Sequence, residues 1–448
     1  MRTIQSYDDV AWSISTQIWE NWPELLCADG DIYNDIGVIL SKEFKPLKWA
    51  VFGYLSTGAV NTCFKMEFTN GYGAVIRFPL PGAVMFPVDK VRNEVSTMRY
   101  VLEKTSDKIP ILVPSVVRWI STKESPSELG PFIIMNYIHH TRTMTDLLER
   151  PGRPGGQQPV LNPDLDAGKL EALYGKLCKT WDVLHRPLSY SMNEIVQLGT
   201  LPRSKIRTTT YTKASSYFEA LAELHLQHLQ SQRNEANILP DLSTEVLADD
   251  FRRKFVARFL FRKMIQDQKQ RNQWVFHDNG PFPIWCDNFR PENVLVEDTE
   301  AVTGVVNWEK PENWPEGLDD WCIEYEKALR VFLAAMRKCE DEALQEKLLV
   351  EEQRLSSRMW ESWESGDFWI MYAARNNFAF DVVYWRKIDQ RFFGPGIGKD
   401  GDLSDVWRKR LDLLQPGEKA LMEKCVDLKV KDRDTRPLTW DPDEYTVE

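Results

Sequence analysis

Short runs rich in hydrophobic residues occur over the first part of the chain. The runs are separated by Gly-containing turns, a pattern typical of an antiparallel sheet. Strands are predicted at 51–54, 63–68, 74–78 and 132–137. A helix is predicted over 88–104, because Val91, Val95, Met98 and Val101 recur at helical spacing and form one apolar stripe. This part of the chain therefore reads as a small β-rich unit with one helix.

Further along, the hydrophobic period changes to that of helices. The predicted helices are 170–185, 215–232, 244–271, 318–337, 341–363, 368–390 and 403–424. One hairpin interrupts them, with strands at 293–297 and 302–307 and a turn at 298–300. The polar tail after Cys425 is expected to fray.

Residues 150–164 separate the two parts, since they carry Pro and Gly too densely for a helix or a central strand. We therefore expect an N-terminal β-rich lobe at 1–138, a hinge and linker at 139–165, and a helical lobe at 166–448. The helical lobe contains the hairpin and the loop before it, 284–309. This α+β, two-lobed order resembles the kinase-like architecture.

Composition narrows the choice of partners and location. The 448 residues include 56 Lys and Arg against 67 Asp and Glu, a net charge of −11, so nucleic acid is not expected as a partner. No apolar run approaches the roughly 18 residues of a membrane span, and no signal segment is readable, so membrane insertion is not expected. Seven scattered cysteines without a CxxC pair favour the reducing cytoplasm.

Large aromatic residues are numerous, with 17 Trp, 14 Tyr and 21 Phe. Many of them flank the hairpin, and two interpretations stay open: the rings line a ligand cavity, or they form core. The rings in question are Trp274, Phe276, Phe282, Trp285, Trp308, Trp314 and Trp321.

The loop before the hairpin has the spacing of a kinase catalytic loop. In kinases, an Asp five residues before an Asn accepts the substrate proton, and that Asn and a second Asp after the hairpin hold magnesium. Here these positions are Asn288, Asn293 and Asn307. A neutral amide cannot accept the proton and is a poorer magnesium ligand. The pattern therefore indicates lost phosphoryl transfer, unless the neighbouring carboxylates of Asp287 or Glu309 take over.

The segments 286–296 and 304–309, together with 77–79 and 90–98, resemble the fungal branch of the aminoglycoside phosphotransferase family. Relatives usually have Cys-Asp-Asp and Asp-Trp-Glu where this chain has Cys286-Asp287-Asn288 and Asn307-Trp308-Glu309. The resemblance implies a two-lobed kinase-like fold and covers most of residues 50–325.

Further roles follow from the resemblance. It implies that 53–64 forms the loop over the phosphates and that Arg77 is the phosphate-pairing cation, with Glu94 on the next helix as its partner. It also implies that Met135 and Tyr137 lie in the hinge that receives an adenine. A plain hairpin turn, a structural Arg–Glu pair and an ordinary strand end would fit the same residues.

Our leading hypothesis is a kinase-fold protein that no longer transfers phosphate. It would be reused in fungal secondary metabolism as an enzyme for a cyclisation or isomerisation, including a pericyclic step, on a largely apolar small molecule. It would need no cofactor and no metal. The residues assigned to catalysis are Asn288, Asn293, Asn307 and Asp287, and those assigned to substrate binding are Trp285, Trp308, Glu309, Arg77, Glu94, Met135 and Tyr137.

Two alternatives remain. One is a phosphotransferase that uses ATP and magnesium, with Asp287 or Glu309 replacing the missing carboxylates. The other is a noncatalytic binding module. The sequence does not determine the oligomeric state.

Overall fold

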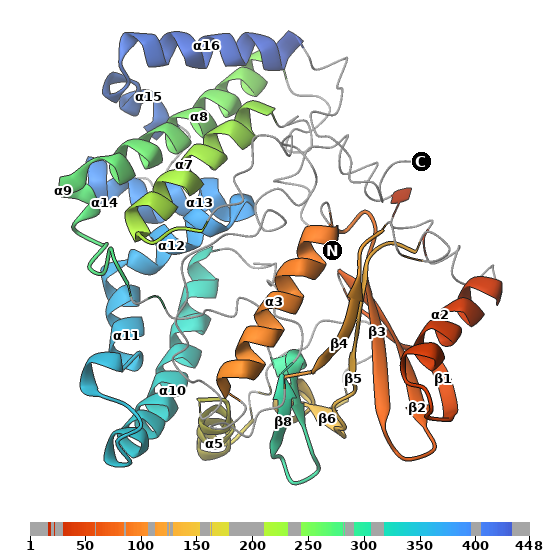
Figure 1. The fold of residues 1–448 in the computed structure, drawn as a ribbon. Coiled ribbons are helices and arrows are strands. Elements are labelled where there is room, and N and C mark those ends of the chain that lie inside the picture. Colours follow the sequence, from red (N-terminus) through yellow and green to blue (C-terminus); the bar gives the residue numbers. More distant parts are fainter. Residues whose placement is uncertain are drawn as a thin grey trace.

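The chain folds into a small β-rich lobe and a larger, mainly helical lobe (Figure 1). The computed structural model describes residues 17–18, 22, 30–58, 60–84, 87–105, 113–122, 125, 129–152, 162, 164–178, 210–231, 243–280, 282, 291–305, 318–395 and 405–431. The expected α+β, two-lobed arrangement is confirmed.

The small lobe contains a five-stranded antiparallel sheet with the strand order β1-β2-β3-β5-β4. Its strands are β1 (Trp49–Thr57), β2 (Asn61–Phe68), β3 (Gly73–Pro79), β4 (Val116–Ile120) and β5 (Phe132–Asn136). The sequence predicted all of these except β4. That strand lies at the edge of the sheet and has only one buried residue, Ile120, so its hydrophobic pattern is weak.

Each face of this sheet is covered by one helix, α2 (Gly30–Glu43) or α3 (Pro87–Thr105) (Figure 1). Side chains of a strand point alternately to the two faces. Ile76 and Ile134 pack in the cluster that includes α2, whereas Val75 and Ile133 pack against α3. The predicted apolar stripe of α3 is confirmed, since all its members are buried in the second cluster: Val91, Val95, Met98 and Val101.

A second, three-stranded sheet follows the hinge and has the order β6-β7-β8. It consists of β6 (Arg142–Thr143), β7 (Val294–Val296) and β8 (Val302–Val305), and α4 (Met144–Leu148) comes directly after β6. The predicted hairpin is confirmed, with a first strand shorter than predicted, and its turn includes Glu300 at a φ of 59°. Residues 306–307, predicted to end the second strand, lie outside the described residues. Pairing of Arg142 with Val296 brings the end of the hinge to the hairpin.

The helices of the larger lobe contribute to several clusters, of which the largest among the described residues is an aromatic core. Their bounds are α5 Ala167–Cys178, α7 Ala214–Ser231, α8 Thr244–Gln266, α9 Gln268–Arg271, α10 Leu318–Gln345, α11 Ser356–Ser365, α12 Asp367–Arg375, α13 Phe380–Val383, α14 Asp389–Phe393, α15 Val406–Arg410 and α16 Pro416–Lys431. Within this core α7 packs on α8, and α16 packs across α8 (Figure 1).

Several predicted helix limits were wrong. The helix predicted over 341–363 is the end of α10 followed by α11, and Gly366, at a φ of 81°, then separates α11 from α12. The helix predicted over 368–390 breaks at Asn376. The helix predicted over 403–424 divides before Pro416, which begins α16 because proline fits the first turn of a helix. The fraying expected after Cys425 was wrong for 426–431, since α16 continues to Lys431, and the rest of the tail lies outside the described residues.

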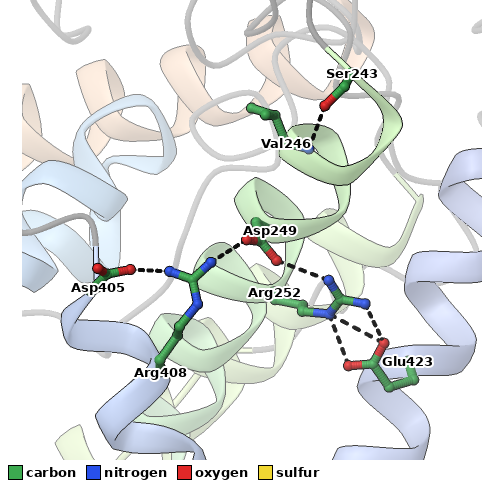
Figure 2. Close-up of polar contacts among 7 residues, drawn as sticks. All are labelled: Ser243, Val246, Asp249, Arg252, Asp405, Arg408 and Glu423. Carbon is green, nitrogen blue, oxygen red and sulfur yellow. Dashed lines mark hydrogen bonds and ion pairs between the residues drawn. The ribbon is translucent and has the colours of Figure 1, made fainter.

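Ion pairs on one side of this lobe join α8 to the last two helices. Arg252 on α8 bonds Glu423 on α16 at 2.7 Å and Asp249 at 2.9 Å (Figure 2). Arg408 on α15 also pairs with Asp249 and with Asp405. These contacts hold α15 and α16 against the lobe. Among the described residues, no helix combines the length and the apolar character that crossing a bilayer requires.

Candidate functional site

A buried ion pair joins β3 to α3 on the inner face of the small lobe. Arg77 lies two residues after Val75 and shares its face of the sheet, the face that α3 covers. Its Nη2 donates to Oε1 of Glu94. The two residues are 3% and 8% exposed. The structure therefore brings together the two residues that the resemblance pairs.

Lys90 adds a second cation to this pair. Its Nζ lies 3.3 Å from Oε2 of Glu94 and donates to Oδ1 of Asn61 at 3.0 Å. Glu94 thus accepts from Arg77 with one oxygen and from Lys90 with the other. We call Asn61, Arg77, Lys90 and Glu94 the small-lobe charge cluster. Neither Lys90 nor Asn61 was predicted individually as a site residue, although Lys90 and Glu94 have the i, i+4 spacing of a shared helix face.

The segment predicted as a phosphate-covering loop forms the β1–β2 hairpin. Asn61 begins β2, and its backbone oxygen accepts from the N–H of Gly58 at 2.8 Å. The hydroxyls of Thr57 and Thr62 are 2.5 Å apart. Because Asn61 also accepts from Lys90, the hairpin turn is connected to the ion pair of α3.

The two hinge residues have different surroundings. Met135 is buried between the sheet and α3. Tyr137 donates its N–H to the oxygen of Gly73 at 2.8 Å, and the ammonium of Lys65 lies 3.7 Å from the centre of its ring. A Cβ added to Gly73 would lie 2.8 Å from Cβ of Tyr137, so this position needs glycine.

Charged and aromatic neighbours surround Tyr137. Its ring centre lies 5.2 Å from that of His139 and 5.5 Å from that of His140. Lys65 pairs with Glu67 at 2.6 Å, and this hydrogen bond and charge lower the pKa of the Glu67 carboxyl. The ammonium of Lys65 on β2 and the ring of Tyr137 therefore lie together on the same face of the sheet as the small-lobe charge cluster.

Of the four residues that the sequence assigns to catalysis, Asn293 is the one that the structure describes. It ends a short 3-10 turn, Pro291–Asn293, directly before β7 and is 3% exposed. The other site residues predicted in and around this loop lie outside the described residues, so their roles stay predictions. These residues are Trp285, Asp287, Asn288, Asn307, Trp308 and Glu309.

Two of the tryptophans that flank the hairpin in the sequence pack in or against the core of the helical lobe. Trp274 packs against Phe218 with ring centres 4.8 Å apart, and Trp321 stacks on Tyr325 at 4.5 Å, all in the helical lobe. Phe276 is 70% exposed. The core interpretation is therefore correct for Trp274, and Trp321 packs against this core; Trp314, like Trp285 and Trp308, lies outside the described residues.

The described residues fit a phosphate better than a metal. No group of three or more His, Cys, Asp or Glu among them could hold a metal ion, and Asn293 contributes only a neutral amide. The guanidinium of Arg77, by contrast, is a planar donor that suits phosphate oxygens. Among the described residues, Arg77 is therefore the candidate for holding a phosphate, and none of them defines a magnesium site.

Comparison with known proteins gives matches among solved structures alone. No protein-family model matches the sequence, and no curated protein does. A macrolide 2'-phosphotransferase type I is 14% identical, with a TM-score of 0.36 over 80% of this chain and 97% of the other. A variant of aminoglycoside 2'-phosphotransferase-IIIa in complex with GDP is 12% identical, with a TM-score of 0.38 over 90% and 100%. For a macrolide 2'-phosphotransferase from Brachybacterium faecium the values are 12%, 0.33, 78% and 98%.

These TM-scores are low, so the architecture is defined by the order of elements within the chain. That order is a five-stranded antiparallel sheet with α3 between its third and fourth strands in sequence, a short connection, the helices from α4 to α9, the β7–β8 hairpin, and the remaining helices from α10 onward. It is the two-lobed kinase-like fold that the sequence predicted.

Proposed function

We propose that this protein binds the phosphate chain of a nucleotide with its small lobe and transfers phosphate poorly or not at all. The observation that carries the first half is the small-lobe charge cluster. Buried ion pairs contribute little net stability, because desolvation offsets their attraction. A cluster in which two cations and their shared carboxylate are all at most 8% exposed is therefore better explained by ligand binding than by folding.

The second half of the proposal rests on the sequence. Asn288 and Asn307 stand where phosphoryl transfer needs a general base and a metal-binding carboxylate. Loss of a general base alone typically slows a reaction by about 10²–10⁴. The protein would then hold a nucleotide without using it rapidly.

A non-phosphorylating reaction on a largely apolar small molecule remains our proposal for the biological activity. The amides at 288 and 307 support it, since they lower the charge of the site. Trp274 and Trp321 give it no support, because Trp274 is a core residue and Trp321, partly buried, packs against the core. The proposal therefore depends on the loop residues, with Trp285 and Trp308 as the aromatic candidates.

An ATP-dependent phosphotransferase acting on a small-molecule hydroxyl is the second candidate. The Arg77–Glu94 pair favours it, because the resemblance assigns this pair to phosphate binding. In that case Asp287 would act as the base, or Glu309 as the metal ligand.

Restoring the two carboxylates separates these candidates. ATP turnover should be measured with magnesium across a panel of hydroxylated metabolites for the wild type, for Asn288→Asp, Asn307→Asp and for the double variant. We expect background turnover in the wild type and an increase of about 10²–10⁴ in the double variant.

Asn70→Asp is a matched control on an exposed turn, where an aspartate oxygen can still accept from the N–H of Tyr72. It should leave turnover at background. Rapid turnover by the wild type would instead establish the phosphotransferase and refute the proposed loss of transfer. Binding without turnover in every variant would favour a noncatalytic binding module.

A further inference from the structure

Lys90 connects the β1–β2 turn, β2 and α3 through its side-chain contacts to Asn61 and Glu94. We infer that Lys90 is a positioning residue, which acts through Glu94 and Asn61 to hold Arg77 and the turn in one arrangement for an anionic ligand. The inference rests on the proposed function, because the ligand is the nucleotide phosphate.

Lys90 occupies a position that is unfavourable for a lysine. It lies in the first turn of α3, where the helix dipole is positive and disfavours a cation. It also precedes Glu94 by four residues, the weaker order for an i, i+4 pair. Its side chain is 8% exposed, so its charge has lost most of its hydration. Helix stability therefore does not explain the residue.

A second buried lysine provides a direct contrast. Lys254 on α8 is also 8% exposed and pairs with Asp250, four residues away, at 2.7 Å. Here the carboxylate precedes the lysine, which is the favourable order. Lys254 lies inside a long helix of the larger lobe, away from the first turn. The same side chain in the same degree of burial thus has an ordinary structural role at 254 but not at 90.

The bond to Asn61 gives Lys90 its reach beyond the helix. Asn61 uses its side-chain oxygen for Lys90 and its backbone oxygen for the N–H of Gly58. The neighbouring oxygen of Val60 accepts from the N–H of Leu80 at 2.8 Å, at the end of β3. The amides of Gly58 and Leu80 therefore report on the turn that Lys90 holds.

The burial of Arg77 makes this positioning important for affinity. An anion gains contact with a 3% exposed guanidinium only when neighbouring groups give way. The arrangement of Glu94 sets how much of the guanidinium the ligand can reach, and Lys90 holds the second oxygen of that carboxylate. Removing Lys90 should consequently weaken ligand binding although Arg77 is unchanged.

The test compares Lys90→Met with Lys254→Met in the full-length protein. Affinity for ATP with magnesium is measured by calorimetry, and hydrogen exchange of the Gly58 and Leu80 amides is measured without ligand. For Lys90→Met we expect the Kd to rise about tenfold, the scale of one lost charge-assisted hydrogen bond. Exchange at both amides should be faster. Lys254→Met should change neither quantity, even though it also removes a buried charge.

The outcomes separate this inference from the proposed function. If the wild type does not bind ATP, the proposed nucleotide binding fails, and with it the role of Lys90 in affinity. If the wild type binds and Lys90→Met binds equally well with unchanged exchange, the inference fails while the proposed function stands. Equal effects of both lysine variants would show a general loss of stability and would also overturn it.

Discussion

Charged residues are buried in both lobes, but the two clusters are built differently. In the helical lobe Arg258 on α8 makes two bonds to Asp381 on α13, at 2.8 and 3.1 Å, and lies 4.7 Å from the ring centre of Phe380. Arg258 thus has a bidentate partner on another packed helix. In the small-lobe charge cluster, two cations share Glu94 at the junction of a turn, a strand and a helix. The first arrangement fixes helices, whereas the second suits a ligand.

The difference teaches where burial of charge reflects structure and where it reflects function. Burial alone would raise the pKa of Asp381, but the charge and hydrogen bonds of Arg258 lower it by more, so the net shift of the pKa is downward. That group is satisfied by its own partner. A carboxylate shared by Arg77 and Lys90 leaves more positive than negative charge among these three side chains.

The largest expected effect is in the helical lobe. Arg258→Met would leave the carboxylate of Asp381 buried without its bidentate partner, which should lower the free energy of unfolding by about 3–5 kcal/mol. Denaturant unfolding measures this change. Arg262→Met is the matched control, because its pair with Glu223 is partly exposed and should contribute at most about 1 kcal/mol. Similar losses in the two variants would contradict the structural role of the Arg258 pair.

A pH effect of intermediate size is expected from two histidines of the same lobe. Burial and then the charge of Arg258 lower the pKa of His225 to about 4, and burial lowers that of His228 well below its usual range. Above a pH of 6.5, the ordinary pKa of histidine, these side chains are neutral in the folded and in the unfolded chain, and their burial does not lower the free energy of unfolding. Between pH 6.5 and about 4, His225 binds a proton in the unfolded chain but not in the folded chain. The free energy of unfolding therefore falls as the pH falls through this range.

His225→Gln tests this effect, because glutamine can still donate to the oxygen of Ala374, which His225 meets at 2.8 Å. The wild type should lose about 3 kcal/mol from His225 over this range, and the variant should not. Unfolding free energies at several pH values measure the difference. Parallel pH profiles for the two proteins would refute the assignment.

The smallest expected effect compares one glycine in each lobe. Gly73→Ala would bring a new Cβ against Tyr137 and should cost about 1–3 kcal/mol by overpacking. Gly175→Ala on α5 meets no atom within 4 Å and should stabilise the helix by about 0.5–1 kcal/mol. Thermal unfolding gives both signs. A neutral Gly73→Ala would mean that the hinge yields easily around Tyr137.

The sequence was most informative where local patterns act alone. The stripe of α3 and the short β-type runs at β2 and β3 predicted these elements within a few residues. The helix α2 was missed, although Ile32, Ile36 and Leu40 have helical spacing and are all buried. Breaks at Asn376 and before Pro416 were missed because the apolar period runs across them.

The candidate site was predictable only in part. Arg77 and Glu94 came from a motif resemblance, and their contact is present. Lys90 and Asn61 gain their importance from a bond between distant parts of the chain, which no local pattern reveals. The interpretation of the tryptophans as cavity walls was wrong for Trp274, since burial against helices depends on tertiary packing.

The most direct test of the central claim is calorimetric titration of ATP with magnesium into the wild type and Arg77→Met, with Arg262→Met as the control. We predict a saturable signal in the wild type and in the control, and an affinity at least about tenfold lower in Arg77→Met, because a charge-assisted contact to phosphate is removed. Equal affinity in all three proteins, or no binding by the wild type, would contradict a phosphate-binding role for the small-lobe charge cluster.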